Sequence, residues 1–324
     1  MRPPGFWKSD SIISRLLIPF GWGYSIAGVI RRRVQANFAP GCPVVCVGNI
    51  VAGGAGKTPV AIAICKWFRA QQATPHFLTR GYGGSLSGPV QVVPERHDAG
   101  DVGDEALLLA AHAPTWVSRD RAAGAAAAVA AGADVIVMDD GHQNGAVRKT
   151  LSMVIVDGAY GFGNGRVIPA GPLREPLDWG FSRADIAVVL GSSIASVEAA
   201  IPTGFPVIRG DLVPDAGCRA LSGRRVVAFA GIGRPEKFFE TVAALGCAIA
   251  SARSFPDHHS FTAGELAELR AQAASFDAQL LTTEKDLVRI GPEDRSGIVV
   301  IPVEVEWEET TQLDRFLSEV ISSG

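Results

Sequence analysis

A glycine-rich loop that ends in Lys-Thr is the part of this sequence best suited to chemistry, because it can hold the phosphates of a nucleotide. The loop runs from Gly48 to Thr58, and the residues before its Lys-Thr pair are Gly53, Gly54, Ala55 and Gly56. Glycines let the backbone approach a ligand and aim N–H groups at phosphate oxygens, and a helix N-terminus adds positive potential. Lys57 can reach the β- and γ-phosphates, and the Thr58 hydroxyl can hold Mg²⁺. The loop is typical of a P-loop except at Val51, where the common pattern has glycine; the alternative is a tight turn with an incidental lysine.

Two adjacent aspartates offer oxygen ligands for a metal that accompanies a nucleotide. Asp139 and Asp140 follow the apolar residues 135–138, which is the position of a Walker B carboxylate. Mg²⁺ takes hard oxygen ligands and keeps several waters. If the strand continued, Asp140 would face away from Asp139. A helix cap or a turn is the structural alternative for this pair.

Asp104 is a candidate for proton transfer, and His258 is ambiguous without further context. Asp104 and Glu105 stand at the start of a predicted helix, where acidic residues are favoured by the helix dipole. Near a P-loop, such a carboxylate can instead accept the proton of the hydroxyl that receives a phosphoryl group. His258 and His259 lie in a segment typical of a Pro-bounded surface turn, and adjacent histidines rarely share a metal. From the residues alone, both interpretations stay open.

The elements around these residues predict an α/β fold with a mostly parallel sheet covered by helices on both faces. Apolar strands are predicted at 43–47, 76–79, 115–118, 134–138, 153–157 and 186–190, alternating with helices. Ligands of such sheets bind at the carboxyl ends of the strands. Arg80, Asp104, Asp139 and Asp157 all fall at or soon after such ends.

Length and composition fit an enzyme of two domains, or of one large one. The chain has 324 residues, of which 47% are hydrophobic, and a net charge of −3, which argues against nucleic-acid binding. Its five cysteines form no CxxC pair and are typical of a reducing compartment. Turn-like residues near 211–219 predict a boundary, and a late strand is predicted after it at 299–303. We expect an N-terminal segment at 1–35, a P-loop domain at 36–215 and a smaller α/β domain at 216–324, and we expect no protein partner.

The N-terminal segment is apolar but too interrupted to be a signal peptide or a spanning helix. Arg15 lies inside the run of residues 9–30, and Pro19, Gly21 and Gly23 break it. The aromatic residues and the following Arg31–Arg33 suit a bent amphipathic segment in the interface of an anionic membrane. The alternative is a helix packed on the protein's own core.

The motifs, taken in order, resemble those of the tetraacyldisaccharide 4'-kinase (lipid A 4'-kinase) family over nearly the whole chain. Singly they are modest, and in this order they are specific. They are Val47–Ile50 with Gly53–Pro59, Thr79–Gly84, Gly103–Glu105, Asp139–Gln143, Gly161–Arg166, Pro169–Pro176, Gly231–Glu236, Phe255–His259 and Thr283–Asp286. The family's P-loop also lacks the first glycine, which accounts for Val51.

The resemblance implies a P-loop NTPase-like kinase on the cytoplasmic face of the bacterial inner membrane. Its substrates would be ATP with Mg²⁺ and the 4'-hydroxyl of a tetraacylated glucosamine disaccharide 1-phosphate, in lipid A biosynthesis. By motif, Lys57 and Thr58 would hold phosphates and metal, and Asp139 and Asp140 the metal and its surroundings. Asp104 would be the base, helped by His258 from the second domain.

One motif departs from the family, which usually has Asp-Asp-Gly-Phe-Gln-His where this chain has His142 and Asn144 after the two aspartates. This departure leaves the role of that loop open. Two other function classes also remain: a membrane-associated P-loop ATPase switch without a lipid acceptor, and a catalytically idle lipid-binding module. Phosphate transfer from labelled ATP to a lipid A precursor distinguishes the three.

Overall fold

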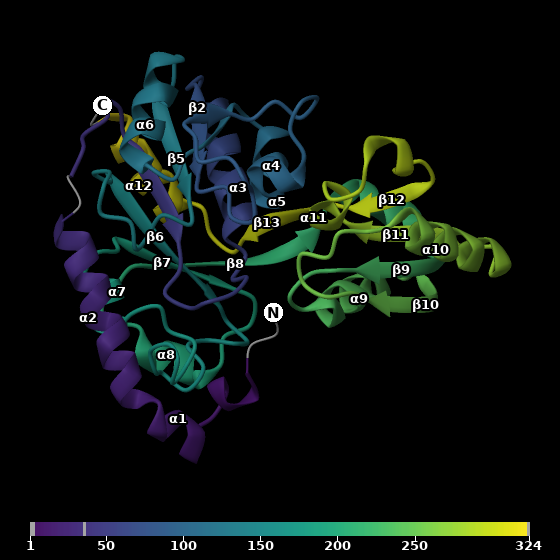
Figure 1. The fold of residues 1–324 in the computed structure, drawn as a ribbon, viewed down its shortest axis with the longest axis horizontal. Coiled ribbons are helices and arrows are strands. Elements are labelled where there is room, and N and C mark those ends of the chain that lie inside the picture. Colours follow the sequence, from purple (N-terminus) through teal and green to yellow (C-terminus); the bar gives the residue numbers. More distant parts are fainter. Residues whose placement is uncertain (1–3, 35–36, 323–324) are drawn as a thin grey trace.

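The protein is built on two β-sheets with helices on both faces of each (Figure 1). The computed structural model describes residues 4–34 and 37–322. Within these residues the larger sheet has nine strands, in the spatial order β13 (Val303–Trp307), β8 (Val207–Pro214), β7 (Ile186–Leu190), β6 (Leu151–Asp157), β1 (Val44–Gly48), β5 (Val135–Asp139), β2 (Pro75–Thr79), β4 (Thr115–Val117) and β3 (Val90–Gln91). Neighbouring strands are parallel, except that β13 is antiparallel to β8 and β3 to β4. The predicted α/β class and mostly parallel sheet are confirmed.

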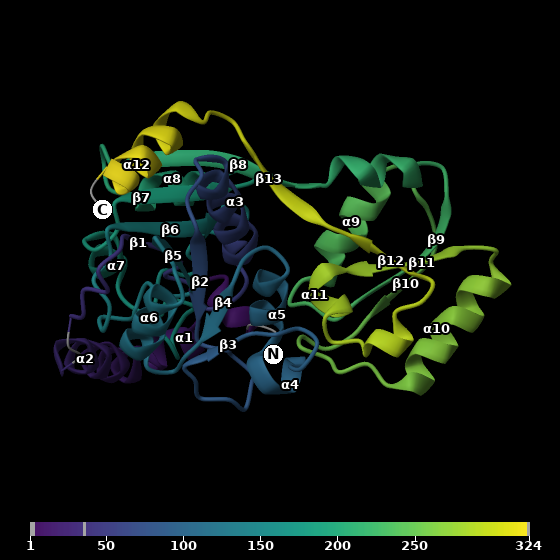
Figure 2. The ribbon, with the colours of Figure 1, turned by 90° about the horizontal axis from the view of Figure 1, so that it is seen from above.

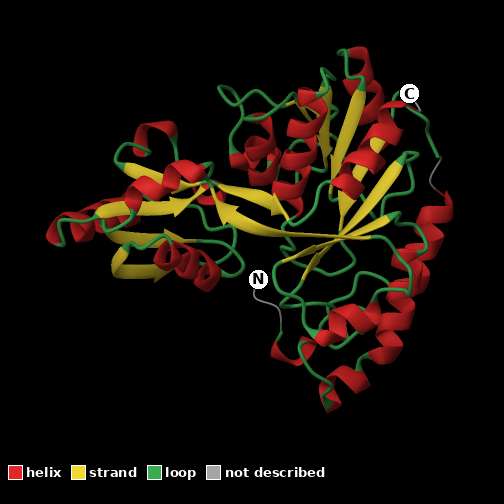
Figure 3. Cartoon of the chain, turned by 180° about the vertical axis from the view of Figure 1, so that it is seen from behind, coloured by secondary structure: helices red, strands yellow, loops and turns green. Residues whose placement is uncertain are grey.

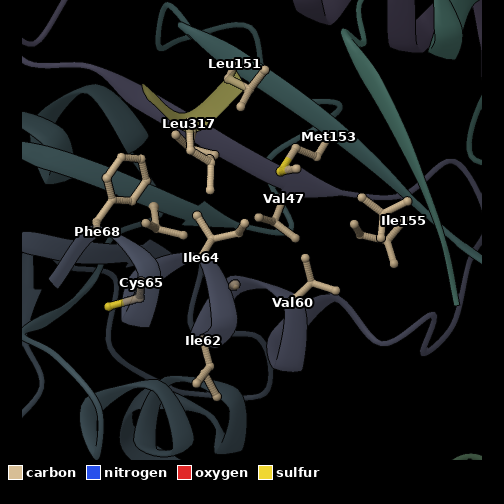
Figure 4. Packing of buried hydrophobic residues seen from close by; sticks show 14 of the residues in the cluster. Val47, Val60, Ile62, Ile64, Cys65, Phe68, Leu151, Met153, Ile155 and Leu317 are labelled. Atoms are coloured by element: carbon tan, nitrogen blue, oxygen red, sulfur yellow. The ribbon is translucent and has the colours of Figure 1, made fainter. Parts of the chain in front are cut away.

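Alternate residues of the central strands face two separate layers of helices. In β1, Val45 and Val47 pack with one layer, and Val44 and Cys46 with the other. The first layer is α3 (Lys57–Ala70), α5 (Asp104–Ala110) and α12 (Thr311–Ser322); the second is α6 (Arg121–Ala130), α7 (Leu177–Phe181) and α8 (Ala195–Ala200). Figure 4 shows how α3 and Leu317 of α12 close over the sheet. Each large apolar side chain buried here contributes about 1.5–3 kcal/mol, so the sheet holds the strand ends, and the polar residues on them, in fixed positions.

The smaller sheet has four parallel strands. Their order is β10 (Ala248–Ser254), β9 (Arg225–Ala230), β11 (Gln279–Thr283) and β12 (Ile298–Ile301). One face is covered by α9 (Pro235–Ala244) and the other by α10 (Ala263–Ser275). The short helix α11 (Glu284–Leu287) follows β11 directly, and α4 (Ala99–Val102) precedes α5 in the larger part. Two 3₁₀ turns, η2 (Ala216–Leu221) and η3 (Pro292–Asp294), complete the smaller part.

Two strands connect the sheets. The chain leaves the larger sheet at the end of β8 and returns along β13, which pairs antiparallel with β8 from Val303 opposite Pro214 to Trp307 opposite Gly210 (Figure 2). The sequence predicted one late strand at 299–303. The structure has two, on different sheets, separated at Pro302, which has no N–H to continue a ladder. Residues 303–322 therefore lie with the larger sheet, and the boundary at residue 216 stays a prediction.

The N-terminal segment is helical and lies along the outer side of the larger part (Figures 1 and 3). It comprises η1 (Gly5–Trp7), α1 (Ile12–Leu16) and α2 (Ile18–Val34), so the helix continues through Gly21 and Gly23, and the break lies at Leu17. Trp7 Nε1 donates to Pro169 O at 3.0 Å. None of the helices formed by the described residues combines the length and apolar character needed to span a membrane. The side chains of the predicted Arg31–Arg33 triplet lie outside the described part.

Candidate active site

The glycine-rich loop connects the end of β1 to the start of α3. Gly53 and Gly56 have φ angles of 123° and 83°, which favour glycine. Asn49 Nδ2 donates to Gly53 O at 3.2 Å and ties the loop to its own start. Gly56 is the N-cap of α3, so the free N–H groups of the first turn open toward the loop. The backbone around Gly54 and Ala55 therefore has the shape that a phosphate cradle needs.

Thr58 and Asp139 are joined directly. Thr58 Oγ1 donates to Asp139 Oδ2 at 3.1 Å. The carboxylate is buried, and its Oδ1 has no hydrogen-bond partner among the described residues. Burial raises the pKa of Asp139 to about 7, against the charge of Lys57 and together with the charges of Asp140 and Glu105. A divalent cation would remove this penalty, because a buried carboxylate needs a facing positive charge.

The carboxylate of Asp140 lies close to the ammonium group of Lys57. The φ angle of Asp140 is 54°, so β5 ends at Asp139 and the chain turns. Asp140 Oδ1 lies 3.8 Å from Lys57 Nζ and 2.8 Å from Arg174 Nη1. Burial alone would raise the pKa of Asp140, but these two cations outweigh it and lower the pKa to about 2. The strand ends at Asp139, so the condition under which Asp140 was expected to face away from Asp139 is not met.

Arg174 is a site residue that carried no role in the sequence analysis, although it lies in one of the family's motifs. Its side chain binds Asp140, and its backbone N–H donates to Ile50 O at 2.7 Å. Gln143 Nε2 donates to Asn49 O at 2.8 Å. These contacts fix the first residues of the loop against the turn that carries the two aspartates.

Asp104 and His258 meet between the two parts of the molecule. Asp104 is the first residue of α5, and His258 lies in the loop that follows β10. His258 Nδ1 is 2.9 Å from Asp104 Oδ2 and 3.3 Å from Oδ1. The φ angle of His258 is 59°, in the left-handed region. The turn predicted at this place is present, and the structure brings its histidine to the carboxylate.

Two cations from the smaller part accompany this pair. Arg289 Nε donates to Asp104 Oδ2 at 2.6 Å, and Lys285 Nζ lies 2.6 Å from Glu105 Oε1. Although burial raises the pKa of Asp104, the hydrogen bond from His258 and the charges of Arg289 and Lys285 lower it well below its usual range. Neither cation was predicted as a site residue, because each reaches its partner over more than half the chain.

The two groups of residues adjoin. Helix α5 contacts α3, the helix that the loop opens, and the charge of Glu105 raises the pKa values of both Lys57 and Asp139. Donor atoms of Asp104, Glu105 and His258 lie within 4.8 Å of one another, a spacing that can suit a metal. Arg289 and Lys285 already pair with these carboxylates. The buried Oδ1 of Asp139 has no partner among the described residues and lies on the carboxylate that Thr58 contacts, so these are hard oxygen donors of the kind that Mg²⁺ takes.

His142 and Asn144, where the motif departs from the family, have structural partners. His142 is buried, with Nδ1 3.2 Å from Ser152 Oγ and Nε2 3.0 Å from Gly180 O. Burial lowers its pKa to about 4. A Cβ at Gly48 would lie 2.5 Å from that of His142, so the backbone and Cβ of His142 pack against the end of β1. Asn144 Oδ1 accepts from Ala146 N at 3.0 Å within its own turn.

Two further residues were singled out at strand ends. Arg80 follows β2 and is exposed. Asp157, the last residue of β6, forms an ion pair with Arg234 and lies 3.9 Å from Lys237 Nζ, both from the smaller part. Asp157 is therefore a second place where the two parts of the molecule are linked by charge.

Comparison with known proteins places the chain in a family. Residues 13–322 match the family described as LpxK, tetraacyldisaccharide-1-P 4'-kinase. The chain is 51% identical over 316 residues to the tetraacyldisaccharide 4'-kinase of Paramagnetospirillum magneticum, covering 97% of each. It is 50% identical over 331 residues to that of Rhodospirillum centenum, covering 99% of this chain and 97% of the relative.

A solved structure agrees with these relatives. The LpxK of Aquifex aeolicus, crystallised in complex with ATP, has a TM-score of 0.78 and 25% identity, and the similarity covers 96% of this chain and 100% of that one. The predicted resemblance, kinase class and place in lipid A biosynthesis are thus confirmed. The family match covers nearly the whole chain, and about half of its residues are identical in these relatives. The chain therefore belongs to the tetraacyldisaccharide 4'-kinases.

Proposed function

We propose that this chain transfers the γ-phosphate of ATP to the 4'-hydroxyl of a tetraacylated glucosamine disaccharide 1-phosphate at a membrane surface. The observation that carries the proposal is the contact of 2.9 Å between His258 and Asp104 beside the glycine-rich loop. A loop shaped for phosphates needs a nearby group that orients and deprotonates an acceptor if it is to phosphorylate an alcohol. Asp104 and His258 supply that group.

The loop from Gly53 to Thr58 holds the triphosphate in this proposal. Its N–H groups and the start of α3 face the phosphates, and Lys57 stabilises the charge that develops on the transferred group. Burial lowers the pKa of Lys57, and the charge of Asp140 opposes that shift. In phosphoryl transfer most of the catalysis comes from such positioning and charge stabilisation.

Thr58, Asp139 and Asp140 are the residues that would hold Mg²⁺. The unpartnered Oδ1 of buried Asp139 and the neighbouring Thr58 hydroxyl are hard oxygen donors of the kind this ion takes. When bound, Mg²⁺ supplies charge neutralisation for the β- and γ-phosphates.

Asp104 accepts the proton of the 4'-hydroxyl while the oxygen–phosphorus bond forms and the bond to the leaving ADP oxygen breaks. His258 donates from Nδ1 to the same carboxylate and holds it in place. The low pKa of Asp104 is compatible with this role, because in a loose phosphoryl-transfer transition state the base chiefly orients the nucleophile.

The N-terminal helices supply the membrane contact, with the active site on the cytoplasmic face of the inner membrane. Large apolar side chains of α1 and α2 are exposed, among them Ile12 at 77%, Leu16 at 71%, Phe20 at 67% and Trp22 at 68%. An exposed apolar surface of this kind favours contact with a membrane, and tryptophan suits the headgroup region of the interface. The opposite side packs on the protein, where Ser14 and Ser25 are buried.

The test is transfer of label from γ-labelled ATP to tetraacyldisaccharide 1-phosphate in mixed micelles, with the 4'-deoxy lipid as the matched control. We expect a labelled 4'-phosphorylated lipid and no product from the control. Release of free phosphate at the same rate with and without lipid would instead support the ATPase switch. Lipid binding with neither activity would support the idle module.

A further inference from the structure

The geometry points to Arg289 as a positioning residue for Asp104. It fixes the carboxylate and binds one of its two oxygens, so that the other oxygen contacts the substrate. This inference rests on the proposed role of Asp104 as proton acceptor. In it, Arg289 occupies Oδ2, and Oδ1 is the atom left to accept the hydrogen of the 4'-hydroxyl.

The guanidinium of Arg289 is buried and held at both ends. Its side chain is 3% exposed. Nη1 donates to Gly231 O at 2.7 Å and to Asp286 Oδ1 at 3.0 Å, both in the smaller part. Nε and Nη2 point to Asp104 in the larger part. Because the group is planar and rigid, fixing one edge on the smaller sheet also fixes the direction of the other edge.

The anchor itself is well supported. Asp286 is fully buried, accepts from Gly231 N–H at 3.0 Å and accepts from Thr283 Oγ1 at 2.7 Å. Thr283 ends β11 and caps α11, so the anchor belongs to the smaller sheet. Arg289 therefore holds the Asp104 carboxylate in a fixed position relative to the smaller sheet.

The contacts make the two oxygens of Asp104 unequal. Oδ2 receives His258 Nδ1 at 2.9 Å, Arg289 Nε at 2.6 Å and Arg289 Nη2 at a still shorter distance. Among the described residues, Oδ1 receives only the longer 3.3 Å contact from His258. A carboxylate offers about two lone-pair positions per oxygen, so Oδ1 retains the capacity to accept from a substrate hydroxyl, and Oδ2 does not.

The charges around Asp104 give the inference a readout beyond stability. The cations that face it are His258 when protonated, Arg289 and Lys285, and Glu105 beside it is already paired with Lys285. Loss of the Arg289 charge removes part of what keeps Asp104 ionised. The acid limb of a kcat profile should then move to higher pH, which a merely structural loss would not cause.

The experiment compares the steady-state kinetics of Arg289→Ala, Arg289→Lys and Lys237→Ala in the full chain. We expect Arg289→Ala to lower kcat about 100-fold with KM for ATP little changed, since a shift of about 1 Å in a reacting group costs this much. Arg289→Lys should recover little of kcat, because one ammonium cannot replace the planar fork. Lys237→Ala is the matched control: it also removes a cation that pairs across the two parts, with Asp157 at 3.9 Å, and should keep kcat within about three-fold.

Two further measurements test whether Arg289 acts through Asp104. Guanidinium chloride below denaturing concentrations should restore part of kcat to Arg289→Ala and none to Asp104→Asn. The kcat of the double variant, Asp104→Asn with Arg289→Ala, should be little lower than that of Asp104→Asn alone.

Near-normal kcat in folded Arg289→Ala would overturn the inference, as would losses that multiply in the double variant. If Arg289→Ala does not fold, Arg289→Lys decides, and near-normal kcat there overturns it. Near-normal kcat in Asp104→Asn would instead overturn the proposed function of Asp104, so the two failures are distinguishable.

Discussion

His258 Nδ1 lies 2.9 Å from Asp104 Oδ2, although 154 residues separate the two in the sequence. Asp104 is placed by the first turn of α5 on the larger sheet, and His258 by a loop of the smaller sheet. The pair therefore exists only when the two parts of the molecule are in this arrangement. Acceptor activation is thereby tied to the relative position of the parts, whereas the glycine-rich loop lies wholly on one of them.

Lys57→Ala should abolish turnover in a folded protein. Lys57 Nζ lies over the loop, 3.4 Å from Gly53 O and 3.8 Å from Asp140 Oδ1. Its loss should lower kcat by about 10²- to 10³-fold or more, the usual cost of removing one group that stabilises transition-state charge. Lys66→Ala is the control, since Lys66 lies on the same helix and pairs with Glu304. Comparable losses of kcat in both variants would contradict the assignment of Lys57 as the residue that stabilises transition-state charge.

Asp139→Asn should damage Mg²⁺-dependent activity more than Asp140→Asn. Asp139 contacts Thr58 and keeps a buried unpartnered oxygen, whereas Asp140 is already paired with Lys57 and Arg174. Titration of activity with Mg²⁺ at saturating ATP should show a higher half-saturating concentration for Asp139→Asn. If Asp140→Asn showed the larger shift, the two carboxylates would have to exchange roles.

The pair Phe20→Ser and Trp22→Ser should weaken binding to vesicles that contain anionic lipid. These side chains are 67% and 68% exposed, so the change removes little packing inside the protein. Losing their transfer to the lipid interface should cost about 2–4 kcal/mol, or roughly 30- to 700-fold in partitioning. Co-sedimentation measures the change, with Ile321→Ser on α12 as the control. Unchanged binding would place the membrane contact elsewhere.

His76 should contribute to acid sensitivity of the fold. Trp116 Nε1 donates to His76 Nδ1 at 3.3 Å, and burial lowers the pKa of His76 below 6.5. The unfolded chain, with the higher pKa, binds the proton first. The stability linked to this group is therefore present above about pH 6.5 and lost as pH falls through the lower folded-state pKa.

Urea unfolding at several pH values checks this linkage. In His76→Asn, which keeps an acceptor, the fall of the unfolding free energy below about pH 6.5 should be shallower by up to about 1.4 kcal/mol per pH unit. An unchanged slope would show that His76 titrates alike in the folded and unfolded chain.

The sequence predicted what local patterns determine. The glycine-rich loop, the apolar strands and Asp139 at the end of β5 follow from residue types over short windows. Position 140 was not predictable in the same way, because only a φ angle of 54° turns its carboxylate toward Lys57. The single strand predicted at 299–303 failed because Pro302 divides it between two sheets.

Contacts between segments that are far apart in the sequence could not be predicted from such local patterns. Arg289 reaches Asp104 over 185 residues, and Lys285 reaches Glu105 over 180. The residues that neighbour each of them in the sequence do not distinguish it from any other charged residue. The roles expected for Asp104 and His258 came from the family resemblance; the structure supplies their contact, and their roles in the reaction stay predictions.

The most direct test of the account is a double-mutant cycle on kcat for lipid phosphorylation, with Asp104→Asn, His258→Ala and the double variant. Each single change should lower kcat by about 10²- to 10⁴-fold, the usual contribution of a general base, with little change in KM for ATP. The double variant should lose little beyond the worse single one, because the residues act as a unit. Losses that multiply fully, or near-normal kcat in Asp104→Asn, would contradict the account.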